Sequence, residues 1–183
     1  RSPYSATKAA SDHLVNSWNN TYGFPTIITN SCNNFGPWQL PEKLIPVIIK
    51  NALDSKSIPL YGDGKNVRDW IYVDDHINAL LKVIIKGKIG DSYCIGAGQV
   101  MSNEEVVEIV CNLLDLYNNK NAPHIKFKKY VKDRAGHDQR YAIDNKKIIN
   151  ELDWMPEYNF LEGIDLTVKW YLKNISWLNQ DFK

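Results

Sequence analysis

The stretch Thr26-Ile27-Ile28-Thr29-Asn30-Ser31-Cys32 decides the fold class, because its β-branched and apolar residues predict a buried strand. Before it, apolar and small residues recur at helical spacing from about Tyr4 to Asn20. Ser2-Pro3 provides the N-cap and first helical residue, and Gly23 and Pro25 end the helix. A helix that leads directly into a buried strand predicts an α/β protein.

The rest of the chain continues this alternation. Helices are expected over residues 42–53, 74–85, 103–117 and 160–172, and strands over 58–61, 68–73, 91–95 and 125–131. Ser102 begins a capping box, Asp74 caps its helix, and Asp144 caps a further short helix. Residues 33–37 are expected to form a loop, and Gly62-Asp63-Gly64 a turn.

Composition excludes several classes of protein. The 183 residues are 44% hydrophobic and carry a net charge of +1, so the chain has no general attraction for nucleic acid or an anionic membrane. No apolar run approaches the roughly 18–20 residues that span a bilayer, and Arg1-Ser2-Pro3-Tyr4 does not open a signal peptide. The three cysteines, Cys32, Cys94 and Cys111, lack metal or disulfide spacing. They are interpreted as reduced, buried thiols of a cytoplasmic protein.

The first chemical signal is the pair Tyr4 and Lys8. Residues four apart lie on one face of a helix, and a nearby ammonium group lowers the pKa of a phenol. Such a phenol can act as the general base for a hydroxyl group that is being oxidised. Taken alone, however, a tyrosine and a lysine four residues apart are more often surface residues without a catalytic function.

Three other patterns each have a plainer explanation. Asp74-Asp75-His76 looks like a metal cluster, but adjacent side chains diverge, and helix capping is favoured with no metal expected. The lysines at 126, 128, 129 and 132 are interpreted as a solvated strand face. Gly96-Ala97-Gly98 lacks the third glycine and acidic residue of a dinucleotide loop, so it is expected to be a loop beside the substrate.

Several segments together resemble the dTDP-glucose 4,6-dehydratases, which belong to the extended short-chain dehydrogenase/reductase superfamily. The most specific of them is Asp133-Arg134-Ala135-Gly136-His137-Asp138-Gln139-Arg140-Tyr141-Ala142-Ile143-Asp144. The others are residues 2–12, Asn33-Asn34-Phe35-Gly36-Pro37, residues 41–46, Tyr61-Gly62-Asp63-Gly64 with Arg68-Asp69-Trp70, and residues 73–76. They follow the order and spacing of the family.

The resemblance implies a role for each matching residue. Tyr4 would take the proton from the sugar 4-hydroxyl while hydride leaves for NAD, and Lys8 would hold the nicotinamide ribose. Asn34 would contact the cofactor, and Asn33, Asn103 and His137 the sugar nucleotide. Arg68 and Arg134 would clamp the diphosphate; for Arg68 and His137 the alternatives are ion pairs with Asp69 or Asp74 and with Asp138. The remaining residues expected to line the nucleotide-sugar pocket are Lys43, Leu44, Ile45, Pro46, Val47, Ile48, Pro59, Leu60, Tyr61, Asp133, Ala135 and Gly136.

The resemblance also implies an architecture: the C-terminal end of a Rossmann-type NAD-binding fold plus a small α/β substrate-binding domain. Residues 1–36 would belong to the Rossmann-type part and residues 37–183 mainly to the nucleotide-sugar domain, with about 68–96 returning to the Rossmann sheet. The intact enzyme would be a cytoplasmic homodimer.

Two features of that family are missing from the chain. It contains neither the glycine-rich nucleotide fingerprint nor the Thr-Asp-Glu loop that would supply the acid and base of dehydration. The expectation is therefore a C-terminal portion, inactive alone, of an NAD-dependent enzyme that converts dTDP-glucose to dTDP-4-keto-6-deoxyglucose. The alternatives are a related NDP-sugar dehydratase or epimerase, or a non-catalytic sugar-nucleotide-binding remnant.

Overall fold

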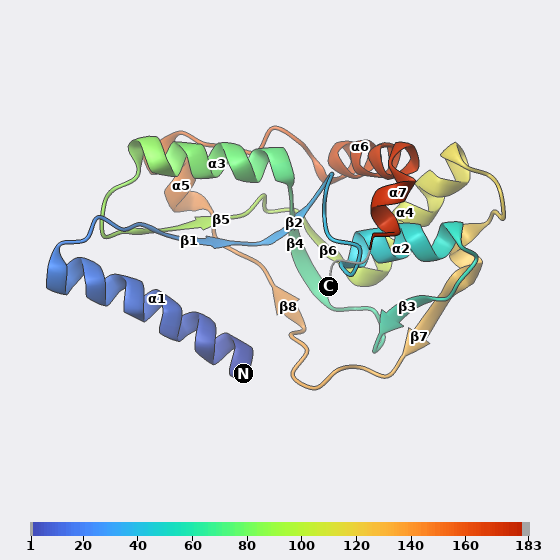
Figure 1. Ribbon diagram of the computed structural model, residues 1–183, viewed down its shortest axis with the longest axis horizontal. Coiled ribbons are helices and arrows are strands. Elements are labelled where there is room, and N and C mark those ends of the chain that lie inside the picture. The colour runs from blue at the N-terminus through green and yellow to red at the C-terminus, as the bar shows by residue number, and fades with distance from the viewer. Residues whose placement is uncertain (1, 181–183) are drawn as a thin grey trace.

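A computed structural model describes residues 2–180 of the chain (Figure 1). Helices and strands alternate, as the sequence predicts, and the fold is mixed α/β. The elements in chain order are α1 (Pro3–Tyr22), β1 (Ile28–Ser31), β2 (Asn33–Phe35), α2 (Leu44–Leu53), β3 (Ile58–Tyr61), β4 (Val67–Tyr72), α3 (Val73–Lys86), β5 (Ser92–Ile95), β6 (Val100–Ser102), α4 (Asn103–Tyr117), η1 (His124–Phe127), β7 (Lys128–Val131), β8 (Arg140–Tyr141), α5 (Lys146–Leu152), α6 (Phe160–Lys173) and α7 (Ile175–Leu178).

One end of the molecule is built on the parallel pair β1–β5, in which Ile28 lies opposite Ser92. Helices α3 and α5 pack against this pair and enclose a small core around Ile71, Tyr93 and Ile95. Helix α1 lies on the other side of the pair, apart from the rest of the chain (Figure 1). None of its side chains is buried, although Ser2 caps it and Gly23 ends it as predicted.

The centre and the other end share a larger core. Strand β4 pairs with β2, β6 and β8, and strand β3 pairs in parallel with β7. Helices α2, α4 and α6 pack together, and their apolar faces surround Phe35 and Trp70. Burial of these faces explains why the strongly periodic segments 103–117 and 160–172 form helices close to the predicted limits.

Several local predictions are wrong. Residues 33–35 form strand β2 instead of a loop, because they pair with β4. The first part of the expected strand 125–131 is the 3₁₀ turn η1, and strands β6 and β8 were not expected. Helix α3 begins after Tyr72 instead of Asp74, and α5 after Asn145 instead of Asp144. The predicted caps lie two residues and one residue, respectively, from the observed ones.

The structure also shows the state of the cysteines and whether any helix could span a membrane. All three cysteines are free; Cys32 and Cys111 are buried as predicted, but Cys94 is only half-buried. No helix within residues 2–180 is long and apolar enough to cross a membrane.

Candidate functional site

The register of β3 and β7 places two distant loops side by side. Tyr61 lies opposite Val131, and the Gly62 N–H donates to the Val131 carbonyl at 3.0 Å. A Cβ placed on Gly62 would lie 3.1 Å from the carboxyl carbon of Asp133. The turn that follows β3 therefore faces the loop that follows β7, and both carry residues singled out in the sequence.

A polar hollow of about 490 Å³ opens between these two loops. Within it the Asp133 Oδ1 atom and the Nδ1 atom of His137 lie 2.7 Å apart, and this contact lowers the pKa of Asp133. The partner of His137 is therefore Asp133 and not Asp138. The side chain of His137 is only 4% exposed, and among the described residues its Nε2 atom has no hydrogen-bond partner. The hollow is lined by Asp63, Lys65, Asn66, Asp133, His137 and Gln139.

Arg68 lies buried on β4 beside this hollow. Its guanidinium donates to the carbonyls of Val67 and Asp138, both at 2.8 Å. Desolvation lowers the pKa of Arg68, the nearby Asp138 opposes this effect, and the positive charge of Arg134 adds to it. Within residues 2–180 no carboxylate forms an ion pair with Arg68, so the alternative pairing with Asp69 or Asp74 is not found.

Arg134 approaches the same region from the β7–β8 loop. Its guanidinium carbon lies 5.8 Å from the centre of the Tyr61 ring, which is a cation–π contact. Like Arg68, it forms no ion pair with a described carboxylate. Two guanidinium groups, one on β4 and one on the β7–β8 loop, therefore share one neighbourhood; Asp138 acts on Arg68 electrostatically, but no described carboxylate forms an ion pair with either group.

Asn103 reaches the site as the first residue of α4. Its backbone N–H donates to the Asn66 carbonyl at 3.0 Å, and the Asn66 side chain donates to the Asp138 carbonyl at 3.2 Å. These bonds join the start of α4 to the loop that carries His137. The sequence analysis did not predict Asn66 as a site residue. Its position two residues before the predicted Arg68 could have indicated it.

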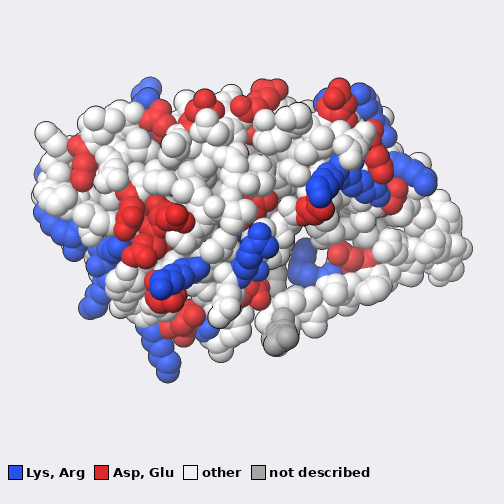
Figure 2. Space-filling view, turned by 180° about the vertical axis from the view of Figure 1, so that it is seen from behind, with Lys and Arg blue, Asp and Glu red and all other residues white. Residues whose placement is uncertain are grey.

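The start of α1 lies beside the same loop. Gly136 has a φ of 69°, and a Cβ on it would lie 3.9 Å from that of Ser2. Tyr4 and Lys8 follow one turn apart, and both are exposed. Figure 2 shows an open gap between α1 and the body of the molecule, with charged side chains facing into it. The predicted base Tyr4 thus follows by two residues the Ser2 that lies beside the β7–β8 loop.

Asn33 and Asn34 lie on β2, away from the hollow. The Asn34 amide nitrogen is 3.2 Å from Nδ1 of His76, while its Oδ1 atom is buried without a partner among the described residues. Nε2 of His76 lies 2.7 Å from Oγ of Ser31, and burial lowers the pKa of His76. The motif Asp74-Asp75-His76 thus supplies a neutral imidazole that orients Asn34, and Asp75 instead accepts two backbone N–H groups, from Glu157 and Tyr158.

Other predicted pocket residues belong to the core. The side chains of Ile45, Pro46, Ile48 and Leu60 are buried in this chain. Leu44, Val47 and Pro59 are half-buried, while Lys43 is exposed and lies 3.3 Å from Glu42. Helix α2 packs against α4 and α6, and a role of these residues in lining the nucleotide-sugar pocket stays a prediction.

One further residue differs from expectation. Lys128 is not on a solvated face, because its side chain is 18% exposed and paired with Glu104 and Glu108. Within residues 2–180 no group of three or more His, Cys, Asp or Glu side chains could hold a metal ion.

Comparison with known proteins identifies close relatives. The chain is 52% identical over 177 residues to a dTDP-glucose 4,6-dehydratase of Shigella flexneri, covering 97% of this chain and 49% of that protein. It is 50% identical to the dTDP-glucose 4,6-dehydratase of Neisseria meningitidis, over 96% of this chain and 51% of that one. The chain thus spans about half the length of the curated relatives it matches.

Solved structures similar to this chain include enzymes of the same kind as the sequence relatives. The dTDP-glucose 4,6-dehydratase of Bacillus anthracis in complex with NAD aligns with a TM-score of 0.87 and 47% identity, over 97% of this chain and 54% of that one. The dTDP-glucose 4,6-dehydratase of Streptomyces venezuelae, also solved with NAD bound, aligns with a TM-score of 0.89 and 42% identity. The alignment covers 96% of this chain and 52% of that one. The model of one family, GDP-mannose 4,6 dehydratase, matches residues 1–167. The chain therefore belongs to the GDP-mannose 4,6 dehydratase family.

Proposed function

We propose that this chain supplies the nucleotide-sugar-binding part and the Tyr4–Lys8 pair of an NAD-dependent dTDP-glucose 4,6-dehydratase, a lyase. The observation that carries the proposal is the approach of Arg68 and Arg134, neither of which has a described carboxylate partner. Two like charges repel each other, so a bound anion would stabilise their proximity. A diphosphate suits them, because guanidinium groups bind phosphate oxygens in a bidentate way.

The neighbouring groups fit the rest of a nucleotide sugar. Nε2 of His137 is buried and free to bond a ligand, because Nδ1 is engaged by Asp133. The half-buried Asn103 at the start of α4 is joined through Asn66 to the loop that carries His137, which supports a role in the same site. The identity to dTDP-glucose 4,6-dehydratases supports a thymidine nucleotide and a glucose group as the substrate.

The described residues also fit NAD. Oδ1 of Asn34 is a buried acceptor without a partner, suited to an N–H donor of the cofactor. When bound, NAD accepts hydride from the sugar and returns it. Tyr4 takes the proton from the 4-hydroxyl at its phenol oxygen, and Lys8, one turn further along α1, holds the nicotinamide ribose. The carboxyl acid and base that expel water from the sugar come from the part of the enzyme that this chain does not span.

Assembly and location are part of the same proposal. Leu14, Trp18, Tyr22 and Phe24 are exposed along α1 and the turn after it, which supports a homodimer formed through this helix. The surface of α1 is almost free of charge in Figure 2. Three free thiols support a cytoplasmic location. We assign residues 1–36 to the Rossmann-type part and 37–183 mainly to the nucleotide-sugar domain.

The test joins the chain to the N-terminal half of the Shigella flexneri relative and measures formation of a 4-keto-6-deoxy sugar from dTDP-glucose. We expect turnover with the joined protein and none with this chain alone. The Tyr4→Phe form of the joined protein should lose several orders of magnitude in rate, because general base catalysis contributes about 10²–10⁴-fold. Interconversion of sugar epimers without loss of water would favour an epimerase, and inactivity with intact dTDP binding would favour a remnant.

A further inference from the structure

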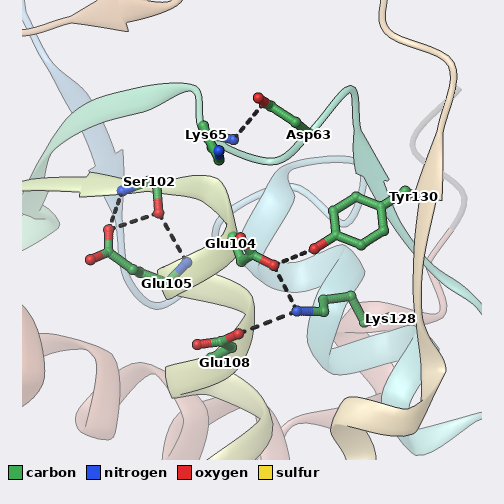
Figure 3. Close-up of polar contacts among 8 residues, drawn as sticks. All are labelled: Asp63, Lys65, Ser102, Glu104, Glu105, Glu108, Lys128 and Tyr130. Atoms are coloured by element: carbon green, nitrogen blue, oxygen red, sulfur yellow. Dashed lines mark hydrogen bonds and ion pairs between the residues drawn. The ribbon is translucent and has the colours of Figure 1, made fainter.

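A cluster of charged side chains lies behind the candidate site, in the first turn of α4. The Glu104 carboxylate accepts hydrogen bonds from Nζ of Lys128 at 2.8 Å and from the Tyr130 hydroxyl (Figure 3). Lys128 also donates to Glu108, one turn further along the helix, at 3.2 Å. Hydrogen bonding to Lys128 and Tyr130 lowers the pKa of Glu104, so the carboxylate is ionised at neutral pH.

The backbone of Glu104 joins a third segment. Its N–H donates to the Gly64 carbonyl at 3.1 Å, and a Cβ on Gly64 would lie 3.2 Å from that of Glu104. Gly64 closes the turn after β3, while Lys128 and Tyr130 lie on β7. A single residue of α4 therefore holds both the turn after β3 and the strand that leads into the β7–β8 loop.

Each of these segments carries a residue of the candidate site. Asn103 immediately precedes Glu104, Tyr61 precedes the turn, and Asp133 follows β7 by two residues. Figure 3 shows Glu104 pointing away from the turn and toward Lys128 and Tyr130. The start of α4, the turn after β3 and the strand that leads to the Asp133–His137 pair are thus joined through Glu104.

We infer that Glu104, with Lys128 and Tyr130, is a positioning unit that holds the β7–β8 loop in its ligand-binding pose. The inference rests on the proposed function for its ligand, but the pose itself is a property of the free chain. Exposed and partly exposed ion pairs add little to the stability of the fold. Loss of the unit should therefore loosen the loop and weaken binding more than it destabilises the fold.

The same helix offers a matched control. Near the other end of α4, the Tyr117 hydroxyl donates to Oδ1 of Asp165, and Lys169 donates to Oδ2 at 2.7 Å. This second cluster also joins one carboxylate, one tyrosine and one lysine, but it connects α4 to α6 and touches no residue of the candidate site. Asp165→Asn thus removes an equivalent set of bonds without affecting the β7–β8 loop.

The experiment measures amide hydrogen exchange of residues 132–139 in the free chain, together with calorimetric binding of dTDP. Glu104→Gln should speed exchange of this segment and weaken dTDP binding by roughly three- to tenfold, the equivalent of about one hydrogen bond. Tyr130→Phe should have a smaller effect in the same direction, because Lys128 still holds the carboxylate. Asp165→Asn should change neither quantity.

The outcomes separate this inference from the proposed function. Unchanged exchange of residues 132–139 in Glu104→Gln would overturn the inference, whether or not dTDP binds. Equal loss of binding in Glu104→Gln and Asp165→Asn would also overturn it, because the effect would then be one of general stability. If the parent chain fails to bind dTDP while Glu104→Gln still loosens the loop, the positioning role stands and the proposed ligand is wrong.

Discussion

The guanidinium group of Arg134 lies over the ring of Tyr61, with 5.8 Å between the guanidinium carbon and the ring centre. The two residues are 73 positions apart and meet because β3 and β7 pair in parallel. The contact holds the Arg134 cation near Arg68, where a diphosphate can bridge the two charges.

Tyr61→Leu should weaken dTDP binding by about two- to fivefold, because an exposed cation–π contact contributes about 0.5–1 kcal/mol. Tyr61→Phe keeps the ring face and should bind as the parent does. Calorimetric titration of both variants provides the test. Equal affinities for the Leu and Phe variants would mean that the ring does not hold Arg134.

Arg134→Ala should weaken dTDP binding by roughly ten- to a hundredfold, because a hydrogen bond to a charged group contributes about 1.5–3 kcal/mol. The dTDP affinity of Arg134→Lys should lie between those of the parent chain and Arg134→Ala, because an ammonium group keeps the charge but loses the bidentate geometry. The side chain is exposed, so neither change should lower the unfolding midpoint. Unaltered affinity in Arg134→Ala would remove this residue from the site.

The chain should self-associate in solution through α1, whose apolar residues are exposed. The open edge of β1, which pairs only with β5 among the described strands, adds a second surface for association. Light scattering over a concentration series measures the mass. Trp18→Asp should shift the chain toward the 21.1 kDa monomer, whereas Leu116→Asp, at an even more exposed apolar residue on α4, should not. A parent chain that stays monomeric at all concentrations would contradict this prediction.

The cysteines should differ sharply in reactivity. Burial raises the pKa of both Cys32 and Cys111 to about 12, so neither forms the reactive thiolate near neutral pH. Cys94 is only half-buried. A thiol reagent at pH 8 should therefore label one cysteine per folded chain quickly and all three after denaturation. Rapid labelling of Cys32 in the folded chain would show that the β1–β5 end opens readily.

The sequence predicts the long periodic elements well, because their apolar faces alone determine where they pack. It fails for β2, β6 and β8, which have two or three residues each and no pattern of their own. Residues 33–35 look like a loop because Asn, Asn and the following Gly favour turns, yet pairing with β4 makes them a strand. Tertiary pairing overrides local preference there.

The candidate site was predictable in its residue types but not in its geometry. The motif around Arg134 and His137 stood out, yet nothing local shows that it would face the turn after β3, because that depends on the β3–β7 register. Similarly, Ile45 and Ile48 have the pattern of a lining helix and the burial of a core helix. Only the packing of α2 against α4 separates the two.

The most direct measurement is calorimetric titration of dTDP into the parent chain and into the double variant Arg68→Met/Arg134→Ala, with UDP and GDP as competing nucleotides. The account predicts one site per chain for dTDP, tighter binding than for UDP or GDP, and loss of detectable binding in the double variant. Binding of dTDP that survives removal of both guanidinium groups, or no binding to the parent chain, would contradict it.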